Sequence, residues 1–177
     1  LTAAHAICKA ALFSGVRCFM NKIVDPKGFG FLITDLSRLI RAEFDRRIGE
    51  TGLGLTAGEA RALSHVARAG GSRQSVLAEK MGVEAMTLTG FLDRLEARGL
   101  VERTTDPSDR RAKLVNLTDE ATTVLATIKD VADAVRAEAS CGIDEDSWRV
   151  MIDTLQRARE NITELRQASS DSQRLAS

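Results

Sequence analysis

The sequence predicts a mostly helical fold with one small β-hairpin, and three patterns in its 177 residues support this. First, apolar residues recur three and four positions apart in several segments, as on one face of an amphipathic helix. Second, the segments 72–81 and 84–98 are separated by Gly82, which can take a positive φ in a sharp turn. Third, the polar segment 104–113 separates two short stretches able to pair as antiparallel strands. Together these patterns predict a winged helix-turn-helix.

The composition is that of an ordinary soluble domain. Hydrophobic residues make up 44% of the chain and charged residues 28%, so a folded core rather than disorder is expected. The net charge is zero, and residues 72–113 hold eight Lys/Arg against seven Asp/Glu, a net of +1. Any affinity for DNA must therefore come from where the arginines stand. No run of 18 apolar residues occurs, which excludes an ordinary transmembrane helix and predicts no membrane partner.

Residues that commonly carry chemistry are few and scattered. Cys8, Cys18 and Cys141 have no metal-ligand spacing and cannot all pair. That pattern suits a reducing cytosol, so we expect a cytoplasmic protein without a metal site. His5 and His65 lie far apart, neither has a companion motif, and the sequence has no Gly-rich phosphate loop and no nucleophile elbow. The sequence therefore predicts no enzyme, no catalytic residue and no cofactor.

Residues 1–30 differ from the rest and are predicted to be an atypical N-terminal extension. They begin without Met, contain two of the three cysteines and end in the breaker PKGFG. In one interpretation Met20 is the natural start and the residues before it are an upstream extension. In the other, residues 3–13 form a short added helix that packs on a partner chain. The residues favour neither interpretation.

Two helices are expected next. The segment 31–50 places its apolar residues on one side of a helix. They are Leu32, Leu36, Leu39, Ile40, Phe44 and Ile48. Thr56 and Glu59 then match a capping box, in which the hydroxyl and the carboxylate each satisfy a backbone N–H at the start of the second helix. The apolar positions of that helix are Ala60, Leu63, Val66 and Ala67.

The helix-turn-helix follows. Ser72 has a hydroxyl that can cap a short helix over 72–81. A second helix over 84–98 carries an apolar stripe on one face and leaves the other face free. The stripe consists of Leu88, Phe91, Leu92 and Leu95. Gly99 is expected to end this helix in the left-handed conformation. In this motif the second helix lies in the DNA major groove.

A hairpin with a basic tip comes after the second helix, and we call it the wing. Residues 100–103 and 114–117 are the two expected strands, and the polar loop 104–113 contains the turn starter Asp106-Pro107. This loop also holds the run Asp109-Arg110-Arg111 and ends at Lys113, and the two arginines and the lysine make the tip basic. Arginine on such a tip suits the narrow minor groove, where the negative potential is strongest.

Two more helices are expected after the wing. Thr118 is predicted to cap the first, with Asp119 and Glu120 in its positive first turn. Its apolar positions are Val124, Ile128, Val131 and Val135. Asp144 is predicted to cap the last helix, where apolar residues recur four and three apart in a heptad-like seam that favours helix–helix packing. The seam consists of Met151, Leu155, Ala158, Ile162 and Leu165.

Several segments match one family closely. They read LAEKMGV at 77–83, LDRLEARGLVER at 92–103, DPSDRRAK at 106–113 and LT at 117–118. At these residues the chain resembles the MarR (multiple antibiotic resistance regulator) family of winged-helix transcription factors, over about residues 31–165. The resemblance implies a two-fold dimer built from the terminal helices. It also implies that small aromatic or phenolic compounds bind in a crevice between those helices and the winged helix.

The expected organisation is a winged helix-turn-helix flanked by dimerisation helices. Residues 31–52 form the N-terminal dimerisation helix, 53–118 the DNA-binding domain, and 119–167 the C-terminal linking and dimerisation helices. Residues 168–177, rich in Ser and Gln, are expected to be a flexible tail. The alternative to dimerisation is that the terminal helices pack on one another within one chain. The expected dimer contacts are Leu36, Ile40, Met151, Leu155, Ile162 and Leu165.

The candidate DNA contacts come from the second helix and the wing. They are Ser75, Ala85, Met86, Thr87, Thr89, Gly90, Asp109, Arg110, Arg111 and Lys113. The resemblance places base and backbone contacts at Thr87 and Thr89, because a threonine can bond to a base edge or a phosphate. It also implies that Arg111 enters the minor groove while Asp109 steadies it. Ser75, Arg110 and Lys113 are weaker candidates, for phosphate contact. The alternative for these residues is that they are solvated surface with no role in binding.

The chain departs from the family's usual pattern at two positions. Glu84 stands where a small capping residue is usual, and Gly90 stands where an Arg or similar polar residue is frequent. Direct readout of bases should therefore be weaker, with more reliance on the wing and on DNA shape. Arg94 and Arg98 are expected to make structural ion pairs with acids of the same helix rather than to bind DNA.

The leading hypothesis is a DNA-binding transcriptional regulator. It would be a homodimeric repressor of a pseudo-palindromic operator, bound to double-stranded DNA and released by a small effector. His65 is a weak candidate for contact with that effector, and a packing or surface role is its alternative. The second hypothesis is a winged-helix module for protein–protein interaction with little DNA affinity, which the near-neutral charge and Gly90 favour.

Overall fold

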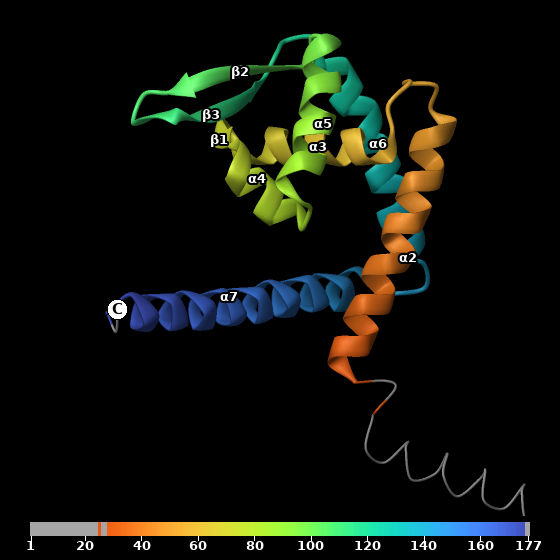
Figure 1. The fold of residues 1–177 in the computed structure, drawn as a ribbon. Coiled ribbons are helices and arrows are strands. Elements are labelled where there is room, and N and C mark those ends of the chain that lie inside the picture. Colours follow the sequence, from red (N-terminus) through yellow and green to blue (C-terminus); the bar gives the residue numbers. More distant parts are fainter. Residues whose placement is uncertain (1–24, 26–27, 176–177) are drawn as a thin grey trace, which may run out of the picture. The chain divides into compact units, whose positions relative to one another are not determined.

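The structure is a computed structural model that describes residue 25 and residues 28–175 (Figure 1). The extension interpretation of residues 1–24, with His5, Cys8, Cys18 and Met20, lies outside the described residues. The chain divides into two compact units, one up to Val131 and one from Ala132. The elements are α2 (Phe29–Glu50), α3 (Ala57–Ala69), β1 (Ser72–Arg73), α4 (Gln74–Met81), α5 (Ala85–Ala97), β2 (Val101–Asp106), β3 (Asp109–Leu117), α6 (Ala121–Ala139) and α7 (Glu145–Leu175).

The core of the first unit lies between α3, α4, α5 and a small sheet. Its largest fully buried side chains include Leu63 of α3, Leu77 of α4 and Val115 of β3. The stripe predicted on α5 is confirmed, because Leu88, Leu92 and Leu95 are fully buried; Phe91 is half-buried. Burying one such leucine contributes about 1.5–3 kcal/mol. This core fixes the orientation of α5.

The helix α3 begins as its sequence predicts. The Thr56 hydroxyl accepts the backbone N–H of Glu59, and the Glu59 carboxylate accepts the backbone N–H of Thr56, so the capping box is confirmed. The predicted apolar side is shifted at one position: Ala67 is exposed and Ala62 is buried instead. Ala62 lies on the same face of the helix as the buried Val66, four positions later.

The start of α4 differs from the prediction. Ser72 does not cap it, because Ser72 and Arg73 form the short strand β1, which pairs antiparallel with Val115 and Leu114 of β3. The helix begins at Gln74, and its N-cap residue Arg73 makes no capping side-chain bond. The Ser72 hydroxyl instead donates to the Ala69 carbonyl at 3.4 Å. The sheet order is β1-β3-β2.

The wing is a longer ladder than its sequence suggests. The strands β2 and β3 continue through most of the polar segment 104–113 and leave only Pro107 and Ser108 between them. The expected ten-residue loop is therefore wrong. Threonine has a high strand propensity, so Thr104 and Thr105 continue the pairing. Figure 1 shows β2 and β3 extending away from α5.

The C-terminal helices begin differently from one another. The helix α6 starts at Ala121, so Asp119 and Glu120 precede its first turn, and the Thr118 hydroxyl donates to the Gly99 carbonyl instead of capping. The predicted cap of α7 is confirmed, because the Asp144 carboxylate accepts the Ser147 N–H at 2.9 Å. Hydrogen bonds from the Ser147 side chain and from its backbone N–H hold the pKa of Asp144 below its usual value.

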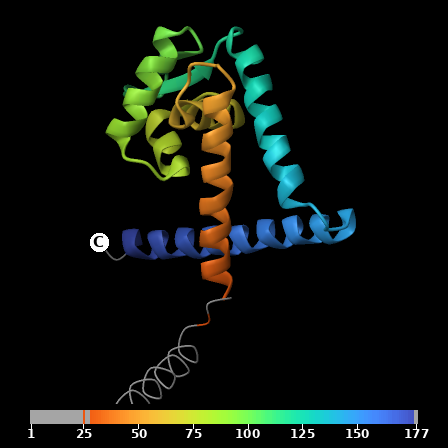
Figure 2. The same ribbon diagram turned by 90° about the vertical axis from the view of Figure 1, so that its right-hand side faces the viewer.

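The helix α7 continues farther than expected. It runs without a break to Leu175, through residues expected to be a flexible tail (Figure 2). Ile162 and Leu165 of its heptad-like seam are 54% and 68% exposed, whereas Met151 and Leu155 are half-buried. No helix in the described part of the chain is both long and apolar enough to cross a bilayer.

Candidate nucleic-acid interface

The front of α5 is a solvent-exposed surface held by a buried back. Ala85, Met86 and Thr87 are all exposed at its first turn, and Met86 is 88% exposed. Exposing an apolar methionine side chain to water contributes nothing to the stability of the fold. The N-cap residue Glu84 makes no capping hydrogen bond, so its departure from the family pattern leaves the helix start without a side-chain cap.

The second threonine of α5 is bound by the protein itself. Thr89 is half-buried, and its hydroxyl donates to the Ala85 carbonyl at 2.9 Å and accepts a hydrogen bond from the Gln74 side-chain amide. This contact fastens α5 to the start of α4. At Gly90 an added Cβ would meet only Arg94 Nη1, at 3.6 Å, so a side chain would fit there. Thr87 therefore presents the more accessible hydroxyl of the two threonines.

Arg94 makes an ion pair, but with a different helix from the one expected. Its Nε donates to the buried Glu59 carboxylate of α3, and its guanidinium lies 5.6 Å from the centroid of the Phe91 ring. Burial raises the pKa of Glu59, but the bonds from Arg94 and Thr56 outweigh it and hold that pKa below its ordinary value. The start of α3 is thereby tied to α5.

The end of α5 is held by two further arginines. Arg98 donates to the Leu53 and Gly54 carbonyls, each at 2.8 Å, rather than to an acid of its own helix. Asp93 and Glu96, the nearby acids of α5, instead bind Arg103 of β2, whose Nη2 lies 2.7 Å from Asp93 and 2.5 Å from Glu96. The sequence reasoning missed Arg103. Its bonds fix the base of the wing against α5.

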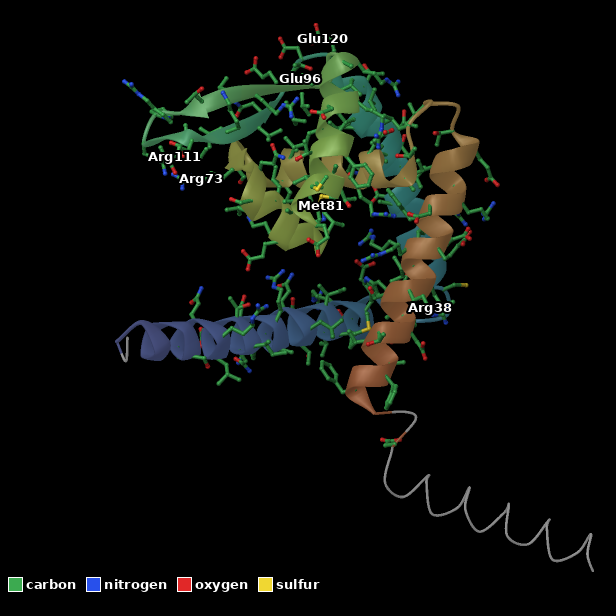
Figure 3. All side chains as sticks on the ribbon, viewed as in Figure 1. Arg38, Arg73, Met81, Glu96, Arg111 and Glu120 are labelled. Carbon is green, nitrogen blue, oxygen red and sulfur yellow. The ribbon has the colours of Figure 1, made fainter. Side chains whose placement is uncertain are left out.

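The basic tip of the wing is exposed. Arg110, Arg111 and Lys113 are all exposed, while Lys113 Nζ also donates to the Thr105 hydroxyl at 2.9 Å. Asp109 accepts the backbone N–H of Arg111 at 3.1 Å, so it orders the backbone at this arginine. Figure 3 shows Arg111 and Arg73 on the same side of the first unit, at the wing.

A cluster at the turn of the wing was not predicted. Arg73 of β1 donates to Asp106 at 2.6 Å through Nε and to the Ser108 hydroxyl at 3.1 Å through Nη2. Asp106 is buried, and the hydrogen bonds from Ser108 and Arg73 lower its pKa to about 2. The one local signal was Asp106-Pro107-Ser108, since an Asp at that place bonds to the backbone two residues on. Nothing local to Arg73 pointed to its partners.

The remaining candidate residues belong to other elements of the chain. Ser75 is exposed at the start of α4 in the first unit, whereas Leu36 and Ile40 are exposed apolar residues of α2. Cys141 is an exposed free thiol. Among residues 25 and 28–175 no group of three His, Cys, Asp or Glu side chains could hold a metal ion.

His65 is half-buried on α3 in a positive environment. Burial lowers its pKa, and Arg68, Lys80 and Arg61 lower it further. The folded chain thus resists protonating His65, whereas the unfolded chain protonates it near pH 6.5. Stability from this group is present above that pH and is lost as the pH falls through it toward the folded-state pKa.

The pH dependence can be measured directly. Between about pH 7.5 and 5.5 the melting temperature of the wild type should fall more than that of His65→Gln, because the variant has no imidazole to protonate. The matched control is His5→Gln, which removes the other histidine. If His5→Gln flattens the pH profile and His65→Gln does not, the assignment to His65 is wrong.

The fold and the exposed surfaces of α5 and the wing define a winged-helix DNA-binding regulator. Known proteins agree with that class. The sequence profile of the MarR family matches residues 55–113. The crystal structure of the transcriptional regulator PA3341 is 38% identical, with a TM-score of 0.66, and the alignment covers 77% of this chain and 99% of that one.

Two further solved structures narrow the class. A MarR-family transcriptional regulator from Rhodococcus sp. RHA1 is 32% identical over 72% of this chain and 89% of its own, with a TM-score of 0.62. CouR from Rhodococcus jostii RHA1, solved with p-coumaroyl-CoA bound, is 29% identical over 73% and 90%, with a TM-score of 0.61. This chain belongs to the MarR family of transcriptional regulators, as its sequence resemblance implied.

Proposed function

We propose that the chain is a homodimeric repressor that places α5 in the major groove of an operator half-site and the wing in the adjoining minor groove. The observation that carries this proposal is that the front of α5 and the arginines at the tip of the wing are both exposed in one compact unit. Arg111 enters the narrow minor groove, and Thr87 with Met86 faces base edges. The supporting phosphate contacts come from Ser75, Arg110 and Lys113.

The dimer follows from apolar surface on the terminal helices. On α2 the exposed residues include Phe31, Leu32 and Leu39, and on α7 they include Ile162 and Leu165. Exposed apolar side chains at repeated spacing gain free energy when a second copy covers them. A two-fold dimer would hold two recognition helices one duplex turn apart, which is why the operator would be pseudo-palindromic.

Release is proposed to occur through a small aromatic or phenolic ligand that stabilises a half-site spacing unsuited to DNA. The support comes from a relative: CouR was solved with p-coumaroyl-CoA bound. Such a ligand must favour the unbound spacing by about 10⁴-fold, or roughly 5.5 kcal/mol, to turn a mostly bound regulator into a mostly free one. His65 remains the candidate residue for contact with that ligand.

The alternative is a winged-helix module for protein–protein interaction. The near-neutral charge favours it, and so does the engagement of the Thr89 hydroxyl within the protein. A fluorescence-anisotropy titration against the promoter region beside its own gene separates the two functions. Tight binding whose log Kd changes with log salt by about 0.9 per phosphate neutralised supports the repressor. Micromolar affinity for any DNA, with flat salt dependence, supports the alternative.

The wing arginine provides a local test. Arg111→Ala should weaken operator binding by about 1–3 kcal/mol and leave the dimer intact, because it removes one groove contact from an exposed tip. The measurement is anisotropy at fixed salt, together with the mass of the protein in solution. Arg157→Ala removes the same charge from the exposed surface of α7 and should leave affinity unchanged. Equal affinities of wild type and Arg111→Ala would remove the wing from the mechanism.

A further inference from the structure

Arg73 stands where the wing meets the helix-turn-helix. It ends β1, pairs through its backbone with Leu114 of β3, and is also the N-cap residue of α4. Its side chain contacts the far end of the hairpin, where β2 turns into β3. Nε lies 2.6 Å from Asp106 Oδ2, and Nη2 lies 3.1 Å from Ser108 Oγ. One residue therefore contacts both the middle of the ladder, through its backbone, and the turn of the wing, through its side chain.

Asp106 is a buried acceptor with its hydrogen bonds satisfied. Besides Arg73, its carboxylate accepts the Ser108 N–H at 2.8 Å and the Ser108 hydroxyl at 2.7 Å. The strand register shifts at Thr105/Asp106, so the ladder is irregular at this point. Hydrogen bonds between ionised partners are about twice as strong as neutral ones. The bonds of Arg73, Asp106 and Ser108, which we call the brace, replace the regular ladder at the turn.

The wing needs such support because little else holds its tip. The strand β1 pairs with β3 only at Leu114 and Val115. Arg111 lies three residues before Leu114, on the side of the turn, and has no partner in the register of β2 and β3. A hairpin of two strands alone is marginally stable in water. Without the brace, the outer half of the wing would be such a hairpin.

We propose that Arg73 is a positioning residue for DNA binding. By holding Asp106 and Ser108 it fixes the direction in which Arg110 and Arg111 leave the domain, relative to α4 and α5. This inference rests on the proposed function, since it assigns Arg73 a role in presenting the wing to DNA. It also implies that Asp106, an acidic residue of the wing, supports binding to negatively charged DNA.

The sign of the effect at Asp106 separates the brace from simple electrostatics. Removing a negative charge beside DNA should strengthen binding if only total charge matters. If the brace matters, Asp106→Asn should weaken binding, because a neutral amide cannot hold Arg73 in the same way. Glu102→Gln is the matched control: it removes an exposed acid from the same hairpin and should leave binding unchanged or slightly tighter.

The experiment uses a duplex selected by the full wild-type chain from a randomised library, labelled with fluorescein and titrated by anisotropy at several salt concentrations. Arg73→Gln and Asp106→Asn should each weaken binding by about fivefold to tenfold, and the double variant should be no weaker than either one. The salt dependence of Arg73→Gln should match that of the wild type. If Arg73 contacts a phosphate directly, its slope should instead fall by about 0.9.

Hydrogen exchange at residues 101–117 gives a readout that does not need DNA. Exchange there should quicken in Arg73→Gln and in Ser108→Ala and stay unchanged elsewhere. Ser108→Ala also carries the test if Asp106→Asn does not fold, with an expected loss of about twofold to threefold in affinity. Asp106→Asn that binds DNA as tightly as the wild type, or unchanged exchange in Arg73→Gln, overturns the brace. Selection of no duplex by the wild type overturns the proposed function instead.

Discussion

Glutamate at both Ile162 and Leu165 should give a folded monomer that binds the operator at least about 100-fold more weakly, which is a loss of about 2.8 kcal/mol or more. Both side chains are exposed on α7 and belong to its heptad-like seam, so the chain on its own does not need them to fold. A charge buried in an apolar interface is costly. A monomer reaches only one half-site, and the binding free energy of the second is lost.

A control variant adds the same charge to a different face of α7. Gln156→Glu with Thr163→Glu adds the same two charges to exposed positions of α7 outside the seam, and this variant should remain dimeric. Size-exclusion chromatography coupled to light scattering measures the mass of each variant, and fluorescence anisotropy measures its affinity for the operator. A variant with glutamate at Ile162 and Leu165 that is still dimeric would show that the seam is not the interface.

Leu92→Ala should lower the free energy of unfolding by about 2–5 kcal/mol. Leu92 is fully buried on α5, and removing its side chain leaves a cavity where α5 packs on the rest of the core. The measurement is urea denaturation at one fixed protomer concentration, because dimer formation makes apparent stability depend on concentration.

The same helix provides the control. Met86→Ala removes a large apolar side chain from the exposed face of α5 and should change stability by no more than about 0.5 kcal/mol. Its effect should appear in DNA affinity instead. Equal destabilisation by the two substitutions would contradict the division of α5 into a buried face and an exposed face.

The helices were predictable because their signals are local. The spacing of Leu88, Leu92 and Leu95 is enough to define the buried face of α5, and Thr56 with Glu59 defines the start of α3. These signals depend on residues within one or two turns of each other. The α5 helix and its closing Gly99, with φ of +69°, appear where the sequence places them.

The sheet was less predictable because its pairing is non-local. Ser72 looks like a helix cap by itself, and only β3, some forty residues later, makes it part of a strand. The same limit applies to the side-chain bonds of the site. Arg73, Arg94 and Arg103 find their partners through the tertiary fold. The sequence therefore suggested a structural role for Arg94 but not its acid, and it gave no sign of the bonds of Arg73 or Arg103.

The two faces of α5 have a consequence for how regulators of this kind diverge. Substitutions at Ala85, Met86 and Thr87 meet solvent, whereas those at Leu88, Leu92 and Leu95 meet the interior. A gene duplicate could therefore explore new target sequences without first acquiring compensating mutations. For the same reason, a library randomised at the three solvent-facing positions should stay largely folded, which makes this helix a practical starting point for engineering new promoter specificity.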